Sequence, residues 1–254
     1  MTRFLAVLFA LTFPMLAMAE DVVLGLSQKN VRITTNFDGS EILIFGAVKR
    51  DAPAPDSAPL DIVVAIEGPS KPLMVRRKER KLGIWVNVDA VEVDEAPGFY
   101  SIATTAPFED VLSNTEDLRY SVSIPRAIRS VGAPMNVQDA ESFVDAVIRI
   151  RQSNGLYQLN ENAVELTEQT LFRTHIALPA NLTEGSYKTR IFLTRSGNVV
   201  SKFETVIEVR KVGLERFLYN LSRQQPLVYA LLSLAIAITA GWLASAAFRL
   251  LQRN

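Results

Sequence analysis

Two apolar runs stand near opposite ends of the chain, and their surroundings differ. Near the N-terminus, Arg3 precedes an apolar run over residues 4–11, and Ala17-Met18-Ala19 follows it. A basic start, a short apolar core and an A-x-A site predict a secretory signal peptide over residues 1–19. The alternative, a retained anchor, is disfavoured because the run is too short to cross a bilayer.

The second apolar run, residues 226–248, contains no charged residue. At ~1.5 Å per residue it reaches ~34 Å, enough to cross a hydrocarbon core of ~30 Å. It predicts a single transmembrane helix, followed by a cytoplasmic tail over residues 249–254. The flanking basic residues orient it only weakly, so the signal peptide decides the topology, with the ectodomain outside.

Small residues recur at every fourth position within the predicted span: Ser233, Ala237, Gly241 and Ser245. Small side chains at this spacing let helices approach closely. The stripe is a candidate contact face for a membrane partner or a second copy of the chain. The alternative is coincidence, since the segment is rich in alanine and serine.

Residues 213–225 have a different apolar pattern. Leu214, Phe217, Leu218 and Leu221 fall on one face of a helix. This spacing predicts an amphipathic juxtamembrane helix. It would lie on the membrane surface or pack against the ectodomain.

Residues 20–124 alternate in short apolar and polar stretches that are typical of strands. The predicted strands cover residues 31–33, 41–46, 60–67, 71–75, 83–88 and 98–104. Turn residues separate them, so the pattern predicts a mainly β fold, an immunoglobulin-like antiparallel sandwich.

The period changes over residues 125–155. The positions with helical spacing are Ala140, Phe143, Val144, Val147 and Ile148. We expect a helical connector here, with Asn136 capping its start and Gly155 ending it.

Strand patterns return over residues 156–212, at 171–178, 186–194 and 199–209, with a hairpin turn at 196–198. Leu178-Pro179 before Gly185-Ser186-Tyr187 is similar to the turn that enters a strand in immunoglobulin-like sandwiches. Gly98-Phe99-Tyr100 repeats this pattern. The repeat favours two sandwich domains, 20–124 and 156–212; the alternative is one domain with a helical insertion.

The composition removes several kinds of chemistry. The chain has no cysteine and one histidine, His175. Disulfides, thiol catalysis and cysteine metal sites are therefore excluded. His175 stands in an alternating, strand-like segment and no G-x-S-x-G is present, so it is interpreted as a structural or surface residue. We expect neither a metal nor another cofactor, although a carboxylate-only metal site stays open. The 27 basic and 27 acidic residues balance, which argues against nucleic-acid binding.

One charge cluster could carry binding. Residues 76–81 contain five basic side chains, Arg76, Arg77, Lys78, Arg80 and Lys81, shortly before Trp85. Interpreted as a hairpin turn, this run would present cations to oxyanions, anionic lipids or an acidic partner. The alternative is a solvated turn. Trp85 is expected in the core, or else beside a ligand.

Several of these motifs together resemble the alphaproteobacterial putative transmembrane protein family. They are the basic run followed by Gly83-Ile84-Trp85, the two G-x-Y strand entries, and Gly213 to Tyr219 before Pro226 and Gly241-Trp242. The resemblance implies a bacterial inner-membrane protein with a periplasmic ectodomain and no catalytic residues. It also implies an accessory role beside a sulfite-exporter-like permease.

Three functions compete at this point. The first is a non-enzymatic, membrane-anchored accessory or assembly factor for an inner-membrane partner such as a transporter. The second is a periplasmic binding module for oxyanions or anionic glycans through residues 76–81. The third is a carboxylate hydrolase or transferase using Glu109, Asp110, Glu116 or Asp117, which are more simply interpreted as a polar loop or short helix.

Overall fold

The computed structural model describes residues 20–27, 30–33, 39–50, 58–130, 137, 139–212 and 214–251. The predicted signal peptide and the predicted cap Asn136 lie outside these residues. The chain divides into two units, one holding the β-sandwich and its helices, the other holding the two C-terminal helices. Each unit is described by itself.

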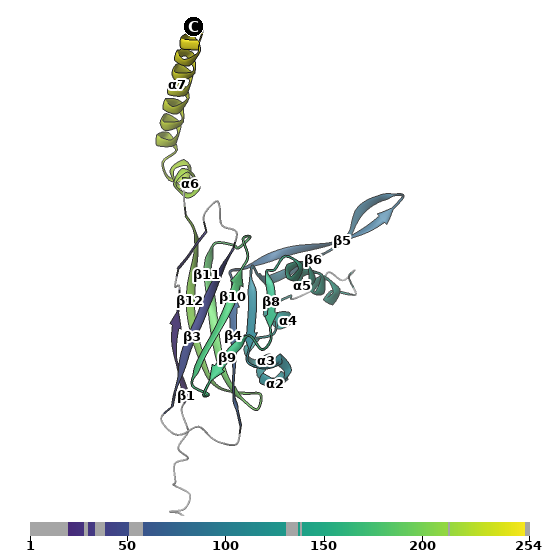
Figure 1. Cartoon of the computed structure of the whole chain (residues 1–254). Coiled ribbons are helices and arrows are strands. Elements are labelled where there is room, and N and C mark those ends of the chain that lie inside the picture. Colours follow the sequence, from purple (N-terminus) through teal and green to yellow (C-terminus); the bar gives the residue numbers. More distant parts are fainter. Residues whose placement is uncertain are drawn as a thin grey trace, which may run out of the picture. The chain divides into compact units, whose positions relative to one another are not determined.

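The strands form two larger sheets and one hairpin. Their bounds are β1 Glu20–Leu26, β2 Asn30–Ile33, β3 Ser40–Arg50, β4 Leu60–Glu67, β5 Ser70–Lys81, β6 Ile84–Pro97, β7 Tyr100–Thr104, β8 Tyr157–Asn160, β9 Val164–Thr167, β10 Leu171–Leu178, β11 Gly185–Arg195 and β12 Asn198–Lys211. One sheet has the order β1-β3-β10-β9, the other β2-β12-β11-β4-β7-β8, and β5 pairs with β6 alone. The four-stranded sheet lies across the six-stranded one (Figure 1).

The first core lies between these two sheets. On β10, buried and exposed residues alternate along the whole strand, with Phe172 and Ile176 inside. This alternation is typical of a strand that faces the core on one side and water on the other. β4 behaves differently, because Leu60 and residues 62–66 are all buried. A continuous apolar strand indicates that both faces of the sheet are covered at β4.

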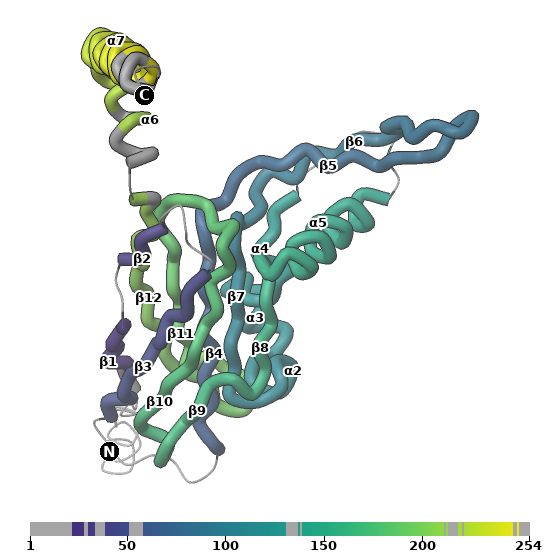
Figure 2. The backbone as a smooth tube through the Cα atoms, turned by 45° about the horizontal axis from the view of Figure 1, so that its top comes forward, coloured from purple at the N-terminus to yellow at the C-terminus, as the bar shows by residue number. Residues whose placement is uncertain are grey.

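The second face of the six-stranded sheet is covered by helices. They are α2 Phe108–Val111, α3 Asn114–Tyr120, α4 Ile124–Ala127 and α5 Glu141–Ser153. Val63, Ala65 and Phe192 of the sheet form a buried cluster with Val122 and Val147 of the helical layer. The domain therefore has three layers: sheet, sheet and helices (Figure 2).

The helical layer begins earlier than the predicted boundary at residue 125. α2 and α3 lie within the segment that was predicted to be β. They are short, and Ser113 caps α3 by accepting from the backbone N–H of Glu116 at 3.4 Å. Helices of this length present too few turns for an apolar period to be visible.

α5 confirms the second half of the helical segment predicted over residues 125–155. Phe143 and Val147 are buried. After the helix, Gly155 has φ +69°, and its N–H donates to the carbonyl of Gln152 at 3.0 Å. The N–H of Leu156 donates to the carbonyl of Arg151 at 2.8 Å. This pair of bonds is the Schellman ending, in which glycine takes the left-handed position.

The strands of the two predicted sandwich domains share sheets, so the division into two domains is wrong. β10 pairs with β3 from Leu171↔Ala47 to Leu178↔Ser40, and β11 pairs with β4 from Lys188↔Glu67 to Arg195↔Leu60. β7 and β8 also pair, in parallel. The alternative, one sandwich with a helical insertion, describes these residues. Local strand patterns carry no information on which strands pair across the chain.

The other unit contains α6 Leu214–Gln224 and α7 Pro226–Leu251. Both predicted helices are confirmed as helices. Their hydrogen bonding continues across the junction, since the N–H of Gln225 donates to the carbonyl of Leu221 at 3.0 Å and that of Tyr229 donates to the carbonyl of Gln225 at 3.1 Å. α7 runs past the predicted end at residue 248, so the first part of the predicted tail is helical.

Candidate functional site

The hairpin β5–β6 leaves the body of the sandwich as a projecting arm (Figures 1 and 2). At its base, Val91, Val93 and Ala96 are buried, and the last two belong to the apolar cluster between the six-stranded sheet and the helical layer. Beyond Arg76 the side chains of β5 are exposed. At ~3.3 Å per residue, residues 76–82 extend the arm by about 20 Å. A two-stranded ribbon is marginally stable alone, so support from a third element matters.

The basic run lies along β5 and is not itself the turn, which corrects the sequence interpretation. The turn is Leu82-Gly83, with φ +51° and +87°. These positive values are typical of the two-residue hairpin turn that follows the twist of the strands. The register shifts by one residue between Arg77 and Lys78, where Val88 of β6 has no partner on β5.

Arg77 differs from the other basic residues of the run because it contacts the start of α5. Its Nη2 lies 3.2 Å from Asp139 Oδ2 and donates to Ser142 Oγ at 2.7 Å. Its guanidinium stacks 4.6 Å from the centre of the Phe143 ring. The hydrogen bond from Ser142, together with Arg77, lowers the pKa of Asp139. Arg77 therefore holds the arm to the start of α5.

A second arginine holds the other end of α5. Arg151 donates to the carbonyl of Pro97, at the end of β6, and its guanidinium lies 5.3 Å from the centre of the Tyr157 ring. Tyr157 donates to the same carbonyl at 2.9 Å. Burial raises the pKa of Tyr157 to about 12. α5 is thus fixed along the base of the arm at both of its ends.

A groove of about 530 Å³ lies between the arm and α5. Its lining combines apolar residues with charged residues that are mostly basic. The lining residues are Val75, Arg76, Arg77, Lys78, Asp139, Ser142, Phe143, Ala146, Arg149 and Ile150. Three of the five basic residues singled out in the sequence meet here. Among the residues that the structure describes, Arg76 and Lys78 form no ion pair. Both belong to the lining of the groove and are exposed.

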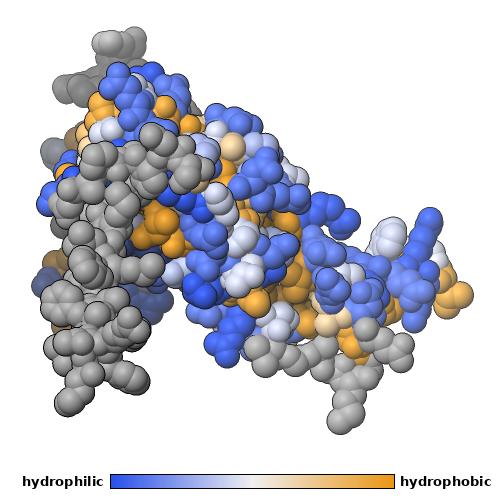
Figure 3. Space-filling model, turned by 90° about the horizontal axis from the view of Figure 1, so that it is seen from below, coloured by the Kyte–Doolittle hydropathy of each residue, from blue (hydrophilic) through white to orange (hydrophobic). Residues whose placement is uncertain are grey.

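Arg80, Lys81 and Trp85 lie beyond the groove, near the apex of the arm. Lys81 Nζ lies 3.4 Å from Glu79 Oε2. Trp85 is 68% exposed, so the expectation of a core residue is wrong. The reason is that neither sheet nor helix covers this end of the hairpin. Leu82 and Ile84 are exposed beside it, and apolar surface gathers at the end of the arm among hydrophilic side chains (Figure 3).

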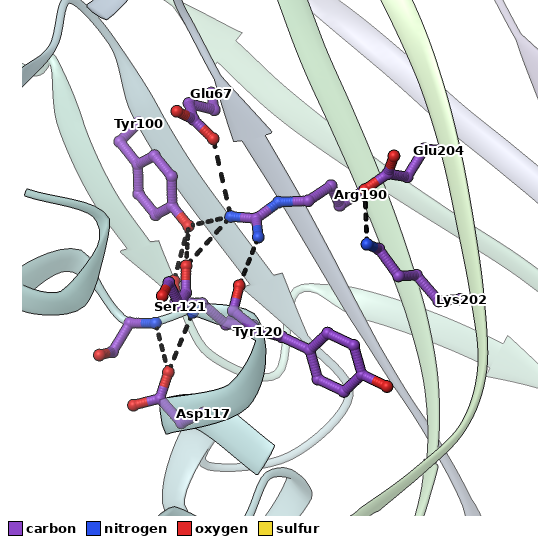
Figure 4. Close-up of polar contacts among 10 residues, drawn as sticks. Glu67, Tyr100, Asp117, Tyr120, Ser121, Arg190, Lys202 and Glu204 are labelled. Carbon is purple, nitrogen blue, oxygen red and sulfur yellow. Dashed lines mark hydrogen bonds and ion pairs between the residues drawn. The ribbon is translucent and has the colours of Figure 1, made fainter.

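The helical layer under the groove is fixed by a buried polar cluster (Figure 4). Arg190, 7% exposed, donates to the carbonyl of Tyr120 at 2.6 Å and to that of Ser121 at 3.2 Å. It also donates to the hydroxyl of Tyr100 at 2.8 Å, and Glu67 lies 3.8 Å away. Burial raises the pKa of Tyr100 well above its usual range, so Tyr100 stays protonated as a donor. This cluster was not predicted, since its residues lie far apart in the sequence.

The carboxylates considered for catalysis have structural partners. Asp117 accepts from the N–H groups of Val122 and Ser123 at 3.0 and 2.7 Å and lies 3.0 Å from Arg126 Nε. Glu116 pairs with Arg119 at 2.7 Å. Both are buried, whereas Glu109 and Asp110 occupy the first turn of α2. These contacts give Asp117 and Glu116 a structural role in the helical layer.

His175 lies on the outer face of β10, where its Nδ1 is 3.4 Å from Glu41 Oε1. The imidazole is 54% exposed, which confirms the interpretation as a surface residue. Within the described part of the chain, no group of three His, Asp or Glu side chains is placed to hold a metal.

The four small residues of the predicted membrane face, Ser233, Ala237, Gly241 and Ser245, all lie on α7 and are exposed. Ser233 Oγ donates to the carbonyl of Tyr229 at 2.8 Å, which satisfies its hydroxyl within the helix. A side chain at Gly241 would meet open space. Their role as a contact face stays a prediction.

The fold and the C-terminal helix define the class of protein. The chain combines an antiparallel sandwich with one apolar helix, Pro226–Ser245, that is long enough to span a membrane. It belongs to the putative transmembrane protein family (Alph_Pro_TM), whose model matches residues 21–250. This confirms the resemblance seen in the sequence, and the match includes the arm, α5 and both C-terminal helices. A comparison with curated proteins finds no match.

Proposed function

We propose that this single-pass membrane protein is a non-enzymatic accessory or assembly factor for a bacterial inner-membrane partner such as a permease. Its sandwich would stand in the periplasm. The observation that supports the proposal best is the groove between the arm and α5. It combines apolar lining residues with an excess of basic charge, and it lies beside an element that projects from the domain.

The groove lining favours a protein segment that is both apolar and acidic. Phe143, Ala146 and Ile150 offer α5 contacts at one-turn spacing, as in grooves that hold an extended or helical peptide. Arg76, Lys78 and Arg149 supply positive charge around them. Complementary charge at such a rim raises the rate of association and excludes wrong partners.

The experiment is affinity purification with crosslinking from native membranes, followed by mass spectrometry. A photo-crosslinking residue at Ala146 reports on the groove itself. The Arg76→Glu/Lys78→Glu variant reverses two basic lining residues of β5 that have no ion partner among the described residues. Arg77 is left intact, because its loss would detach the arm from α5.

The matched control is Lys71→Glu/Lys188→Glu, which reverses two exposed charges outside the groove. We expect a stoichiometric membrane protein in the wild-type and control samples and its loss in the groove variant. A partner retained equally in all three would remove the groove from the proposal and direct attention to α7. No reproducible partner would contradict the accessory role.

The second candidate is a small oxyanion or anionic glycan in the same groove. Arg76, Lys78 and Arg149 favour it, since arginine and lysine bind oxyanions through charge-assisted hydrogen bonds. Arg77 contributes less than the sequence predicted, because Asp139 already neutralises it. Calorimetry of the purified chain with sulfate, sulfite, phosphate and anionic sugars tests this; an absence of binding heat at millimolar ligand contradicts it.

A further inference from the structure

The apex of the arm is apolar although no element of the domain covers it. Leu82, Ile84 and Trp85 surround Gly83, and all three side chains are mostly exposed. Single exposed apolar residues are common on proteins. A contiguous group at the end of a projecting hairpin instead indicates a contact surface.

The backbone of Leu82 strengthens this interpretation. Its φ of +51° lies in the left-handed region, which costs free energy for a residue with a bulky side chain. Turns of this type favour Asn-Gly or Asp-Gly, whose polar residues would also suit an exposed apex. Leu82 is neither asparagine nor aspartate, and its side chain is apolar. A side chain held against a local preference, and facing away from the domain, is expected where something outside the chain contacts it.

Basic residues follow the apolar apex along β5. Lys81 and Arg80 come directly before Leu82, and Glu79, whose carboxylate lies 3.4 Å from Lys81 Nζ, separates them from Lys78. From the apex inward, Leu82 comes first, then Ile84 opposite Lys81, then Trp85 opposite Arg80. Aliphatic, aromatic and cationic side chains thus lie within one short stretch, as in segments that contact a bilayer surface, where tryptophan prefers the interface and basic residues meet the lipid phosphates.

We propose that the apex of the arm, formed by Leu82, Ile84 and Trp85, inserts into the surface of an anionic phospholipid bilayer. Arg80 and Lys81 then contact the headgroup phosphates. This gives a membrane-anchored chain a second, reversible attachment. It goes beyond the proposed partner site, because the groove lies at the base of the arm and the inserted residues lie at its end.

Tryptophan fluorescence tests this directly, since the chain has two tryptophans, Trp85 and Trp242. The Trp242→Phe variant leaves Trp85 as the reporter. The purified full chain is reconstituted into vesicles of phosphatidylcholine alone or of an equal mixture with phosphatidylglycerol. We expect a blue-shifted Trp85 emission in the anionic vesicles, and quenching by lipids brominated near the headgroup.

Two further variants in the same background locate the contact. Leu82→Asn creates the favoured Asn-Gly turn, so the hairpin is retained while the apolar apex is lost, and the quenching should fall. Lys81→Gln should weaken insertion about fivefold, as expected for one basic residue at an anionic surface. Lys71→Gln, at the base of the same arm, should leave it unchanged.

Two results would overturn the proposal. One is a Trp85 emission typical of water in both kinds of vesicle, without bromine quenching. The other is a blue shift without bromine quenching, which would mean that Trp85 is buried against protein. Because the purified system contains no partner protein, either result is independent of whether the groove binds one.

Discussion

The guanidinium of Arg77 lies 4.6 Å from the centre of the Phe143 ring, and this stack joins the arm to α5. Phe143 is buried from the helix side, while Arg77 approaches from β5. The same guanidinium donates to Asp139 and Ser142, so one side chain of β5 joins the arm to the start of α5 by three contacts. The first prediction concerns this contact.

Replacing Arg77 by glutamine should loosen the arm without unfolding the domain. Exposed ion pairs contribute about 0–1 kcal/mol and an exposed cation–π contact about 0.5–1 kcal/mol, so the midpoint of unfolding should hardly change. Hydrogen exchange should instead accelerate over residues 76–90 and 141–146. Arg76→Gln is the control. Unchanged exchange in Arg77→Gln would mean that the arm is held by its apolar base alone.

Replacing Arg190 by methionine should destabilise the whole sandwich. It would leave the carbonyls of Tyr120 and Ser121 without their donor in the buried helical layer. Removing one member of a buried charged network costs about 3–5 kcal/mol, or roughly 10 °C for a domain of this size. Thermal unfolding in detergent measures it.

Glu67→Gln is the matched control for Arg190. Its carboxylate lies 3.8 Å from Arg190 and is partly exposed, so we expect a loss below about 1 kcal/mol. Equal effects of the two variants would show that the ion pair, and not the carbonyl contacts, holds the helical layer in place.

Tyr187→Phe should cost about 1 kcal/mol, because it removes one hydrogen bond and keeps the ring. The Tyr187 hydroxyl donates to the carbonyl of Thr183 at 2.7 Å, just before β11. This is the tyrosine corner known from immunoglobulin-like sandwiches. The midpoint of unfolding should fall by about 2–4 °C. Tyr219→Phe, at an exposed position on α6, should leave it unchanged.

Stability should decline as the pH rises from about 10 to about 12. Burial raises the pKa of Tyr157 and of Tyr187 to about 12, against an ordinary value of about 10. The folded state therefore keeps protons that the unfolded state loses, and the stabilisation is complete below pH 10 and lost through pH 12. Denaturant unfolding at several alkaline pH values measures the decline. Tyr187→Phe should flatten it; an unchanged slope in that variant would contradict the assignment.

The sequence predicts elements well where a residue's neighbours along the chain decide its environment. The strands at 60–67 and 171–178 have the predicted bounds, because an uninterrupted apolar run and a strict alternation each define a strand. α5 and α7 are also evident from their own residues. The turn after Arg195 falls within the predicted one, with Ser196 and Gly197 at positive φ.

Tertiary relationships were not available from these patterns. Gly98-Phe99-Tyr100 and Gly185-Ser186-Tyr187 look like repeats, yet their tyrosines differ. Tyr187 bonds within its own turn, whereas Tyr100 donates to the carbonyl of Val122 at 2.7 Å in the helical layer. Likewise, the six neighbouring residues of the basic run have unequal roles, because α5 lies beside residues 76–78 and not beside those nearer the apex.

The pairing of early with late strands has a consequence for biosynthesis. β3 needs β10 and β4 needs β11, and β11 pairs in turn with β12, which ends at Lys211. Long-range pairings of this kind close large loops and form late. The nascent chain cannot complete its sandwich until almost everything before α6 has been synthesised. The domain can therefore complete its folding only at about the time when the apolar helix α7 is synthesised.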